Sequence, residues 1–361
     1  MDDRLCFPYK DDKKNTLEFA DDIMQVYDRM KDNISRDIFA NRLLFSLTGN
    51  HVYLKNVLLH TAGGNKLNDL LQKDENPKYI YGAGIRGRRL MELFPDVWNG
   101  CIDMNRRLEN YHNVKIVDLE RFMGLYTPGT IIVVSNMSGT DEIVENLHQK
   151  RIAAEDIYVL NDFDKESVQG IYFAPECIGQ TIEKEKCFID IGCFDGKDSL
   201  NYLKWSNNSE AIVYAFEPDI RNYRVCRENL DAYPNIELFN MGLSDVEEEE
   251  VGILGEGEMA YLGTDGDLQI QTQLLDNLMQ DKPIGYIKMD VEGYEEHVLR
   301  GAREIIHSQC PILAVSIYHK KSDIWRIPKL LLEINNNYSF YMRHYSAANG
   351  DTVLYAINSR E

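Results

Sequence analysis

The feature that most constrains the fold is a repeated pattern of apolar runs and turns in residues 187–219. An apolar run, CFIDI, contains Asp190 and leads into a turn with Gly192 and Gly196, after which the pattern becomes helical. A second apolar run, VYAFEPD, reaches Glu217 about twenty residues beyond the turn. This order predicts a strand, a loop, a helix and a parallel strand. The two strand ends then meet at one edge of a sheet, where such folds bind ligands.

The chemistry of the turn separates two kinds of ligand. A dinucleotide loop needs three glycines, G-x-G-x-x-G, to bring the backbone close to a pyrophosphate. This turn has two glycines four positions apart, flanked by Asp190 and Asp195, whose charges repel a pyrophosphate. The same carboxylates suit S-adenosylmethionine, which carries a sulfonium and an ammonium, and Glu217 can accept from ribose hydroxyls. The alternative is an acid-capped turn in an ordinary α/β protein.

The composition limits the partners. The formal net charge of -20 argues against nucleic acid, whose phosphates require a basic surface, and against docking on an anionic membrane. The seven cysteines are scattered without a C-x-x-C pair, which predicts reduced thiols in a cytoplasmic protein. We see neither a signal peptide nor an apolar run long enough to span a bilayer. The composition leaves a small-molecule or glycan acceptor open, and likewise homo-oligomerisation.

The 361 residues divide into three predicted parts. Residues 1–77 form a helical leader, and residues 78–163 form a small Rossmann-like domain with strands at YIY, GCIDMN, TIIVVS and DIYVL. Residues 164–361 contain seven strand patterns with helical patterns between most of them: CFIDI, AIVYAF, IELFN, YIKMD, ILAVSIY, FYMRHY and DTVLYAI. The predicted fold class is α/β, with a doubly wound seven-stranded sheet that has one antiparallel edge strand. We read the glycine-rich residues 252–266 as a loop or hairpin insert.

Polar residues at the ends of the later strands are candidates for the site. In IKMDVEG a buried strand reaches Asp290, Glu292 follows two residues later, and Gly293 allows a turn into a helix. Strand carboxyl ends bind ligands in open α/β sheets, so Asp290 is aimed at the same crevice as Glu217. The alternative role for Asp290 is that of a helix cap. Lys288 alternates with buried positions and could pair with a nearby acid.

Three further strand ends carry polar side chains. Asp245, in GLSD, can accept from an adenine amino group. His319, in SIYHK, is a candidate base for removing a hydroxyl proton near neutral pH. Only one of Arg343 and His344 can face inward, because neighbouring strand residues alternate. The alternative for either histidine is a packing role.

These motifs resemble the FkbM-type S-adenosylmethionine-dependent methyltransferases over about residues 173–357. The resemblance rests on CFIDIGCFDG, VYAFEPD, GLSD, IKMDVEG and the tail SIYHKKSDIW, FYMRHYS and DTVLYA. It implies a class I methyltransferase fold and O-methylation of a hydroxyl on a sugar or a polyketide-like natural product. It implies that the cofactor contacts are Asp190, Gly192, Gly196, Glu217 and Asp245, with Asp290 and Glu292 between cofactor and acceptor. We add Asp195 and Asp290 to the predicted cofactor site.

A hydroxyl acceptor needs its proton removed as the methyl group is transferred. We predict His319 as the base. Asp290 with Glu292 is the second choice, as a base or as ligands of a divalent metal that lowers the hydroxyl pKa. The sequence has no clear metal-binding motif, so the metal requirement stays open.

The small domain carries its own glycine motif. Gly82, Gly84 and Gly87 match G-x-G-x-x-G between a strand and a helix, and Asp103 ends the next strand near the spacing of a ribose-binding acid. The segment therefore predicts a nucleotide or nucleotide-sugar site, or else a domain that packs or dimerises. The alternative function is a nucleotide-sugar-modifying enzyme or binding protein that works through GAGIRG.

Three rival functions remain. Tyr111 and Lys115 have the spacing of an oxidoreductase acid–base pair, but they fall in a short polar link, so we interpret the match as chance. A non-catalytic scaffold is disfavoured by the joint presence of Asp190, Glu217 and Asp290. A nucleic-acid methyltransferase is disfavoured by the acidic charge and by MDVE in place of a DPPY-like tetrapeptide. The sequence leaves protein methylation open.

Overall fold

The chain forms two compact units. The computed structural model describes residues 13–73, 75–104, 109–136, 139–160, 170–178, 185–247, 250–254, 261–263, 268–346 and 350–358. The large unit comprises residues 1–47, 170–343 and 351–361, and the small unit comprises residues 48–169 and 344–350. Each unit is built around its own sheet.

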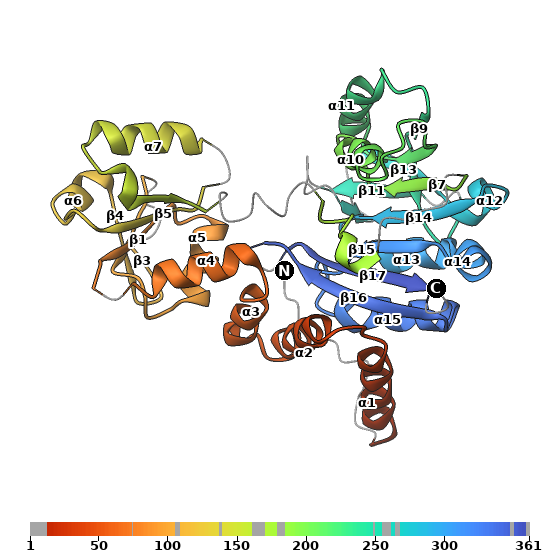
Figure 1. Ribbon diagram of the computed structural model, residues 1–361, viewed down its shortest axis with the longest axis horizontal. Helices are drawn as coiled ribbons and strands as arrows, with labels where there is room; N and C mark the ends of the chain where they lie inside the picture. The colour runs from red at the N-terminus through yellow and green to blue at the C-terminus, as the bar shows by residue number, and fades with distance from the viewer. Residues whose placement is uncertain are drawn as a thin grey trace. The chain divides into compact units, whose positions relative to one another are not determined.

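The large unit contains a seven-stranded sheet whose strands run from β9 to β16 across Figure 1. The strands are β7 (Cys187–Ile191), β8 (Val213–Phe216), β9 (Ile236–Phe239), β14 (Ile284–Met289), β15 (Ile312–Ser316), β16 (Tyr338–His344) and β17 (Thr352–Asn358). Their order is β16-β17-β15-β14-β7-β8-β9. All seven predicted strands are confirmed, and so is the class I methyltransferase topology.

The position of the reversed strand differs from the prediction. β17 is antiparallel to β15, and it lies between β15 and β16 and not at the edge. Its first five residues are buried, as expected of a strand with neighbours on both sides. The last strand of the chain is thus inserted into the sheet, and β16 forms the edge.

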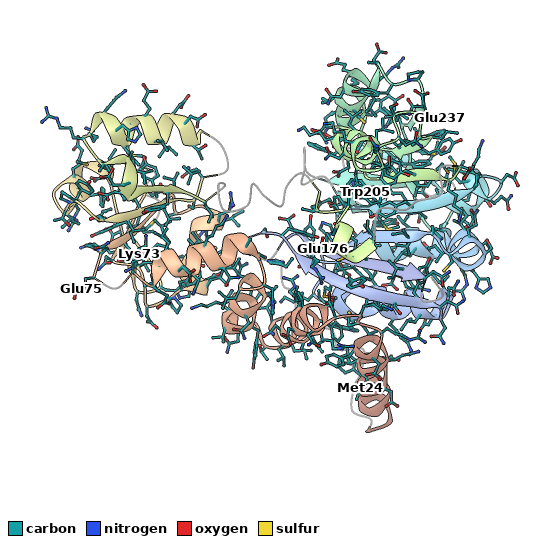
Figure 2. The ribbon with its side chains drawn as sticks, in the orientation of Figure 1. Met24, Lys73, Glu75, Glu176, Trp205 and Glu237 are labelled. Carbon is teal, nitrogen blue, oxygen red and sulfur yellow. The ribbon has the colours of Figure 1, made fainter. Side chains whose placement is uncertain are left out.

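Helices follow most of the parallel strands. They are α10 (Lys197–Trp205), α11 (Ile220–Leu230), α13 (Glu295–Gly301), α14 (Arg303–Gln309) and α15 (Asp323–Ile334), with the short α9 (Pro175–Ile178) and α12 (Leu275–Met279). Trp205 at the end of α10 stacks on Phe173, with ring centroids 5.5 Å apart (Figure 2). Right-handed crossovers run in opposite directions from β7 and from β14, so the crevice for a ligand lies where these two strands adjoin.

The predicted leader does not form a separate part. α1 (Lys13–Asp28) and α2 (Asn33–Thr48) pack on the large unit, whereas α3 (His51–Leu58) and α4 (Ala62–Leu71) belong to the small unit. Phe19 makes an edge contact with Trp325 at 5.8 Å between centroids, and Lys329 Nζ lies 2.7 Å from Asp22 Oδ1. α1 therefore packs against α15, a contact that periodicity along α1 could not reveal.

The small unit has a six-stranded sheet. Its strands are β1 (Lys78–Tyr81), β2 (Gly100–Ile102), β3 (Asn110–Tyr111), β4 (Val114–Val117), β5 (Ile131–Val134) and β6 (Ile157–Val159), in the order β3-β4-β2-β1-β5-β6. α5 (Ile85–Leu93), α6 (Leu119–Met123), α7 (Thr140–Gln149) and a short 3-10 helix (Ala154–Asp156) complete it. The β3–β4 hairpin occupies the predicted polar link. Tyr111 and Lys115 lie on its two strands, which supports the interpretation of their spacing as chance.

The predicted hairpin insert is part of a second sheet in the large unit. β10 (Gly242–Leu243), β11 (Glu250–Leu254), β12 (Tyr261–Gly263) and β13 (Leu268–Gln273) are ordered β10-β13-β11-β12. β11 and β12 pair antiparallel, as in a hairpin. Residues 255–260 and 264–267 of the insert lie outside the described part of the chain. No helix in the described residues is long and apolar enough to cross a bilayer.

Candidate active site

The turn after β7 needs its glycines. Gly192 and Gly196 have φ values of 73° and 79°, a region that L side chains rarely adopt. A Cβ atom on Gly192 would lie 1.8 Å from the carbonyl oxygen of Asp290. The turn therefore passes directly against the end of β14, and this close approach joins the two predicted halves of the site.

Glu217 holds the turn from the end of β8. The residue is 5% exposed. Its Oε2 accepts from the backbone N–H of Phe194 at 3.0 Å, and its Oε1 accepts from the backbone N–H of Asp219 at 2.9 Å. Burial raises the pKa of Glu217 to about 7. Asn222 Nδ2 also donates to Oε1, at 3.5 Å. Ribose hydroxyls would supply further donors that stabilise the charged form. The residue thus fits the ribose of S-adenosylmethionine.

Asp190 lies beneath the turn and is fully buried. It accepts from Ser199 Oγ at 2.7 Å, and Lys288 Nζ lies 3.1 Å from its Oδ1. Lys288 also donates to the carbonyl oxygen of Gly192 at 2.7 Å and lies 3.5 Å from Asp198 Oδ2. The predicted pairing of Lys288 with a nearby acid is confirmed. Asp190 anchors the turn from below, and its direct contact with a cofactor stays a prediction.

The two other predicted cofactor acids lie near the surface. Asp195 accepts from the backbone N–H of Lys197 and so caps the start of α10, and its Oδ2 lies 2.5 Å from Lys197 Nζ. Asp245 follows β10, and its Oδ1 lies 2.8 Å from Nδ1 of His297 on α13. Their roles toward a cofactor stay predictions.

The three predicted catalytic residues meet at the carboxyl ends of β14 and β15. His319 Nε2 lies 3.4 Å from Asp290 Oδ1 and 3.3 Å from Glu292 Oε2. Glu292 has a φ of 52°, unusual for a residue other than glycine, and such strained backbone is concentrated at functional sites. The next residue, Gly293, has a φ of 97° and completes the turn into α13. The chain thus turns sharply so that both carboxylates face the imidazole.

Two residues that sequence reasoning missed support this cluster. Glu295 is buried; its Oε1 lies 2.8 Å from His319 Nδ1 and accepts from the backbone N–H groups of Val291 and Gly293. Tyr172 donates to Asp290 Oδ2 at 2.6 Å. Glu295 stands three positions after Glu292, a helical spacing that could have indicated it. Tyr172 comes from a segment interpreted only as a lead-in and has no such signal.

The electrostatics of the cluster are dominated by carboxylates. Burial acts to lower the pKa of His319, but Glu292, Glu295 and Asp290 outweigh it and raise the pKa to about 11. Burial alone would raise the pKa of Glu295, whereas the neighbouring His319 lowers it. In the absence of another cation, the imidazole of His319 is therefore protonated and charged at neutral pH.

Arg343 and His344 lie away from this cluster, on β16. Arg343 Nη2 lies 2.6 Å from Asp32 Oδ2, and Nη1 donates to Ser35 Oγ at 3.0 Å. His344 is 4% exposed. Arg343 therefore fixes the start of α2 on the edge of the sheet, a structural role.

The glycine motif of the small unit forms the predicted turn between β1 and α5. Gly82 has a φ of 103°, and a Cβ atom on Gly87 would lie 1.9 Å from the carbonyl oxygen of Gly82. Asp103 Oδ2 accepts from the backbone N–H of Ala83 at 2.6 Å. The amide N–H of Ala83 therefore already donates to this carboxylate, whereas a bound pyrophosphate would need it as a donor. Nucleotide binding by this unit stays a prediction.

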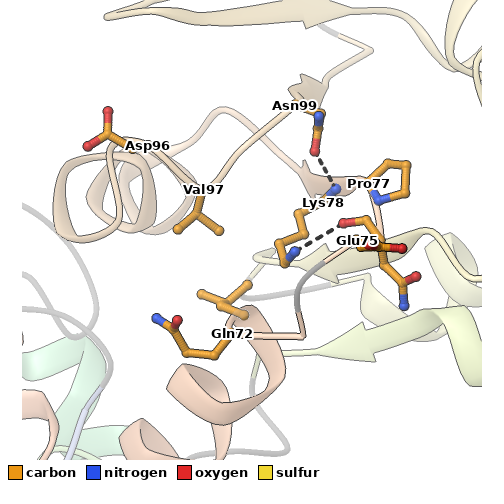
Figure 3. Close-up of a pocket in the computed structure, with 9 residues that line it drawn as sticks. Gln72, Glu75, Pro77, Lys78, Asp96, Val97 and Asn99 are labelled. Carbon is orange, nitrogen blue, oxygen red and sulfur yellow. Dashed lines mark hydrogen bonds between the residues drawn. The ribbon is translucent and has the colours of Figure 1, made fainter.

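A pocket in the small unit lies at the opposite, amino end of β1 (Figure 3). Lys78 forms part of its wall, and its Nζ donates to the carbonyl oxygens of Lys73 and Asn76 at 2.7 and 3.0 Å. The backbone N–H of Lys78 donates to Asn99 Oδ1 at 2.7 Å. These bonds satisfy the buried ammonium within the chain, so we assign the pocket no ligand.

Comparisons with known proteins agree with the geometry of the large unit. The sequence model described as the methyltransferase FkbM domain matches residues 190–345. The 2-O-methyltransferase NoeI of Sinorhizobium fredii (strain NBRC 101917 / NGR234) is 28% identical over 142 residues, 33% of this chain and 58% of NoeI. The chain thus spans less than two thirds of that relative.

Two solved structures are weakly similar to this chain. The methyltransferase FkbM from Methylobacillus flagellatus KT is 16% identical, with a TM-score of 0.48 over 90% of this chain and 99% of its own. Fibrillarin from Aeropyrum pernix, solved with natively bound S-adenosyl-L-methionine, is 12% identical, with a TM-score of 0.31 over 48% of this chain and 67% of its own. The strand order of the large unit and the matched residues carry the assignment. Residues 190–345 of this chain therefore form a domain of the FkbM methyltransferase type.

Proposed function

We propose that this chain is an S-adenosylmethionine-dependent O-methyltransferase that acts on a hydroxyl of a small molecule, with a sugar or glycoconjugate as the favoured acceptor. The observation that carries the proposal is Glu217. It is a buried carboxylate at the end of the second strand, within 3.0 Å of the amide of the glycine turn. The family match over residues 190–345 supports the same activity.

The residues around the turn divide the binding of the methyl donor. Glu217 accepts from the two ribose hydroxyls, and Asp245 accepts from the adenine amino group. The turn from Gly192 to Gly196 passes under the methionine part, held from below by Asp190 and Lys288. Because the donor is positively charged, the excess of carboxylates at this edge of the sheet favours its binding.

The acid cluster lies where the acceptor must be deprotonated. S-adenosylmethionine supplies an activated methyl group: the carbon–oxygen bond forms as the carbon–sulfur bond breaks, and the electron pair stays on sulfur. The chain holds the acceptor hydroxyl in line with that carbon and takes its proton. Asp290 and Glu292 are the groups that receive it, because the imidazole of His319, predicted as the base, already carries a proton at neutral pH. Tyr172 fixes Asp290 by a hydrogen bond of 2.6 Å.

The acceptor class follows from charge and from the relative. NoeI is named a 2-O-methyltransferase, so a hydroxyl is the favoured nucleophile. A net charge of -20 disfavours an anionic acceptor, because the acceptor would approach against the overall field. A neutral polyhydroxyl compound meets both conditions, which favours a sugar.

Calorimetric titration of S-adenosylhomocysteine tests the proposal. We expect micromolar binding by the wild type and binding about ten- to a hundredfold weaker in Glu217→Ala, because buried hydrogen bonds to the ribose are lost. Glu237→Ala is the matched control, since Glu237 is an exposed residue on the neighbouring β9 (Figure 2). Absence of binding by the folded wild type would overturn the proposal.

A further inference from the structure

We propose that Asp290, Glu292 and His319 bind a divalent metal ion, Mg²⁺ or Mn²⁺, at the carboxyl ends of β14 and β15. The role given to this ion, contact with the acceptor hydroxyl, rests on the proposed methyltransferase function. The site itself rests on side-chain geometry alone.

The donor atoms converge. One atom from each of the three side chains lies within 4.8 Å of the others. The two distances from His319 Nε2 are 3.4 Å to Asp290 Oδ1 and 3.3 Å to Glu292 Oε2. Two ligand atoms at right angles around a cation, each about 2.1 Å away, lie about 3 Å apart. The separations to Nε2 therefore need only a small closure to hold one ion.

The imidazole provides a second, independent observation. The His319 side chain is 8% exposed, and its Nε2 faces the two carboxylates. His319 Nδ1 is buried without a hydrogen bond of good geometry within the described residues, and so are the two atoms that face each other, Nε2 and Asp290 Oδ1. Buried polar atoms are almost always satisfied. A bound cation would satisfy both atoms at once.

Glu295 has the position of a residue that orients a metal ligand. Its Oε1 lies 2.8 Å from His319 Nδ1, and its side chain is 1% exposed. A histidine that binds a metal through one ring nitrogen usually has its other N–H directed at a carboxylate or carbonyl oxygen. Glu295 therefore favours the tautomer that leaves the lone pair of Nε2 pointing toward Asp290 and Glu292.

The charge of the cluster points the same way. Asp290, Glu292 and Glu295 place three carboxylates around one imidazole. A divalent ion bound among them would offset two of these three negative charges in a largely buried space. Two carboxylates and one imidazole suit ions that take oxygen ligands and tolerate nitrogen, which is why we name Mg²⁺ and Mn²⁺.

Such an ion would act on the acceptor. A hydroxyl that binds to a divalent cation loses its proton more readily. Asp290 and Glu292 would then act mainly as ligands, and the choice of proton acceptor would shift to solvent or to the carboxylate oxygen left free.

Titration of Mn²⁺ into the chelator-treated full chain tests the site, with free Mn²⁺ followed by electron paramagnetic resonance. We expect one ion per chain, bound at least tenfold more weakly in Glu292→Gln and in His319→Gln. Glu296→Gln is the control, because Glu296 lies on α13 next to Glu295 but pairs with Arg300 and Arg326. Circular dichroism checks that each variant is folded. The Glu292 side chain is 32% exposed, so Glu292→Gln is expected to fold and to test the site even if His319→Gln does not fold.

Each outcome decides one question. Binding that is lost in Glu292→Gln and kept in Glu296→Gln supports the site. Absence of a bound ion in the wild type, or equal binding by all variants, overturns it and leaves a protonated imidazole in the cluster. Binding of S-adenosylhomocysteine in the presence of chelator is measured alongside. If it persists while Mn²⁺ does not bind, the metal site fails and the proposed methyltransferase function stands.

Discussion

Each unit has a glycine turn whose backbone amide donates to a carboxylate from the next strand, and the two units differ in what surrounds this turn. In the large unit Glu217 accepts from the amide of Phe194, and in the small unit Asp103 accepts from the amide of Ala83, at 3.0 and 2.6 Å. Beyond the turn, the large unit adds Lys288 beneath it and an acid–histidine cluster beside it. The neighbouring strand of the small unit, β5, is followed instead by Ser135, whose hydroxyl donates to the carbonyl oxygen of Gly82 at 3.0 Å.

This difference shows that the glycine turn does not specify chemistry by itself. The turn provides a close approach of backbone to ligand, and the ends of the adjoining strands supply the groups that act. Only the large unit carries such groups on strands next to its turn within the described residues.

The largest expected effect is on stability, in Lys288→Met. The substitution leaves Asp190 buried without its cation, which should lower the free energy of unfolding by about 3–5 kcal/mol. Urea denaturation measures this change. Lys329→Met is the control, because the pair with Asp22 is partly exposed and worth less than about 1 kcal/mol. Equal effects of the two substitutions would contradict the anchoring role of Lys288.

The next effect separates the glycines of the two turns. Gly192→Ala should lower the free energy of unfolding by about 2–4 kcal/mol, because the new Cβ meets the carbonyl oxygen of Asp290 and the φ is 73°. Gly84→Ala, in the small unit, should change it by less than about 0.5 kcal/mol, since the φ there is −69° and no atom lies within 4 Å. The same denaturation experiment compares the two variants. A larger loss of stability in Gly84→Ala than in Gly192→Ala would contradict the close approach of the turn to Asp290.

A smaller effect concerns pH. Because burial raises the pKa of Glu217 to about 7, S-adenosylhomocysteine should bind up to about tenfold more tightly at pH 8 than at pH 6, where the carboxylate is mostly protonated. Glu217→Gln should remove this dependence. Calorimetry at both pH values makes the comparison, and a wild-type affinity that falls with pH would contradict the role of an ionised Glu217.

The same shift affects the stability of the ligand-free chain in the opposite direction. The folded state binds the proton of Glu217 more tightly than the unfolded state does. This contribution is fully present below about pH 4.5 and is lost as the pH rises through about 7. The free energy of unfolding of the wild type, relative to Glu217→Gln, should therefore decrease over this interval. A difference that is constant with pH would show that the pKa is not raised.

The smallest effect is expected in the small unit. Asp103→Asn should change the affinity for S-adenosylhomocysteine by less than about twofold, because Asp103 acts on the turn of its own unit. Calorimetry under the conditions used for Glu217→Ala gives the comparison. A tenfold loss would assign the small unit a part in binding the methyl donor.

Much of the fold could be predicted because strand patterns and turn glycines are local signals. The seven runs that became β7 to β9 and β14 to β17 are mostly buried on both faces, so they read as continuous apolar segments. The insertion of β17 between β15 and β16 depends on pairing between distant segments, which no local pattern encodes. The β3–β4 hairpin was missed because both strands are short and β3 has only the two residues Asn110 and Tyr111.

The site divides in the same way. Asp290, Glu292 and His319 could be predicted, since each follows an apolar run at a strand end. Glu295 has only its spacing from Glu292 as a signal and Tyr172 has none, because their contacts with His319 and Asp290 depend on how α13 and the segment before α9 pack. Supporting residues are fixed by tertiary packing and leave little trace in sequence spacing.

Hydrogen exchange with and without S-adenosylhomocysteine tests the central claim most directly. The account predicts slower exchange of amides in residues 192–200 and 217–222 of the large unit, with residues 82–90 of the small unit unchanged. Protection of residues 82–90 alone, or no protection in either turn at saturating ligand, would contradict the assignment of the methyl-donor site to the large unit.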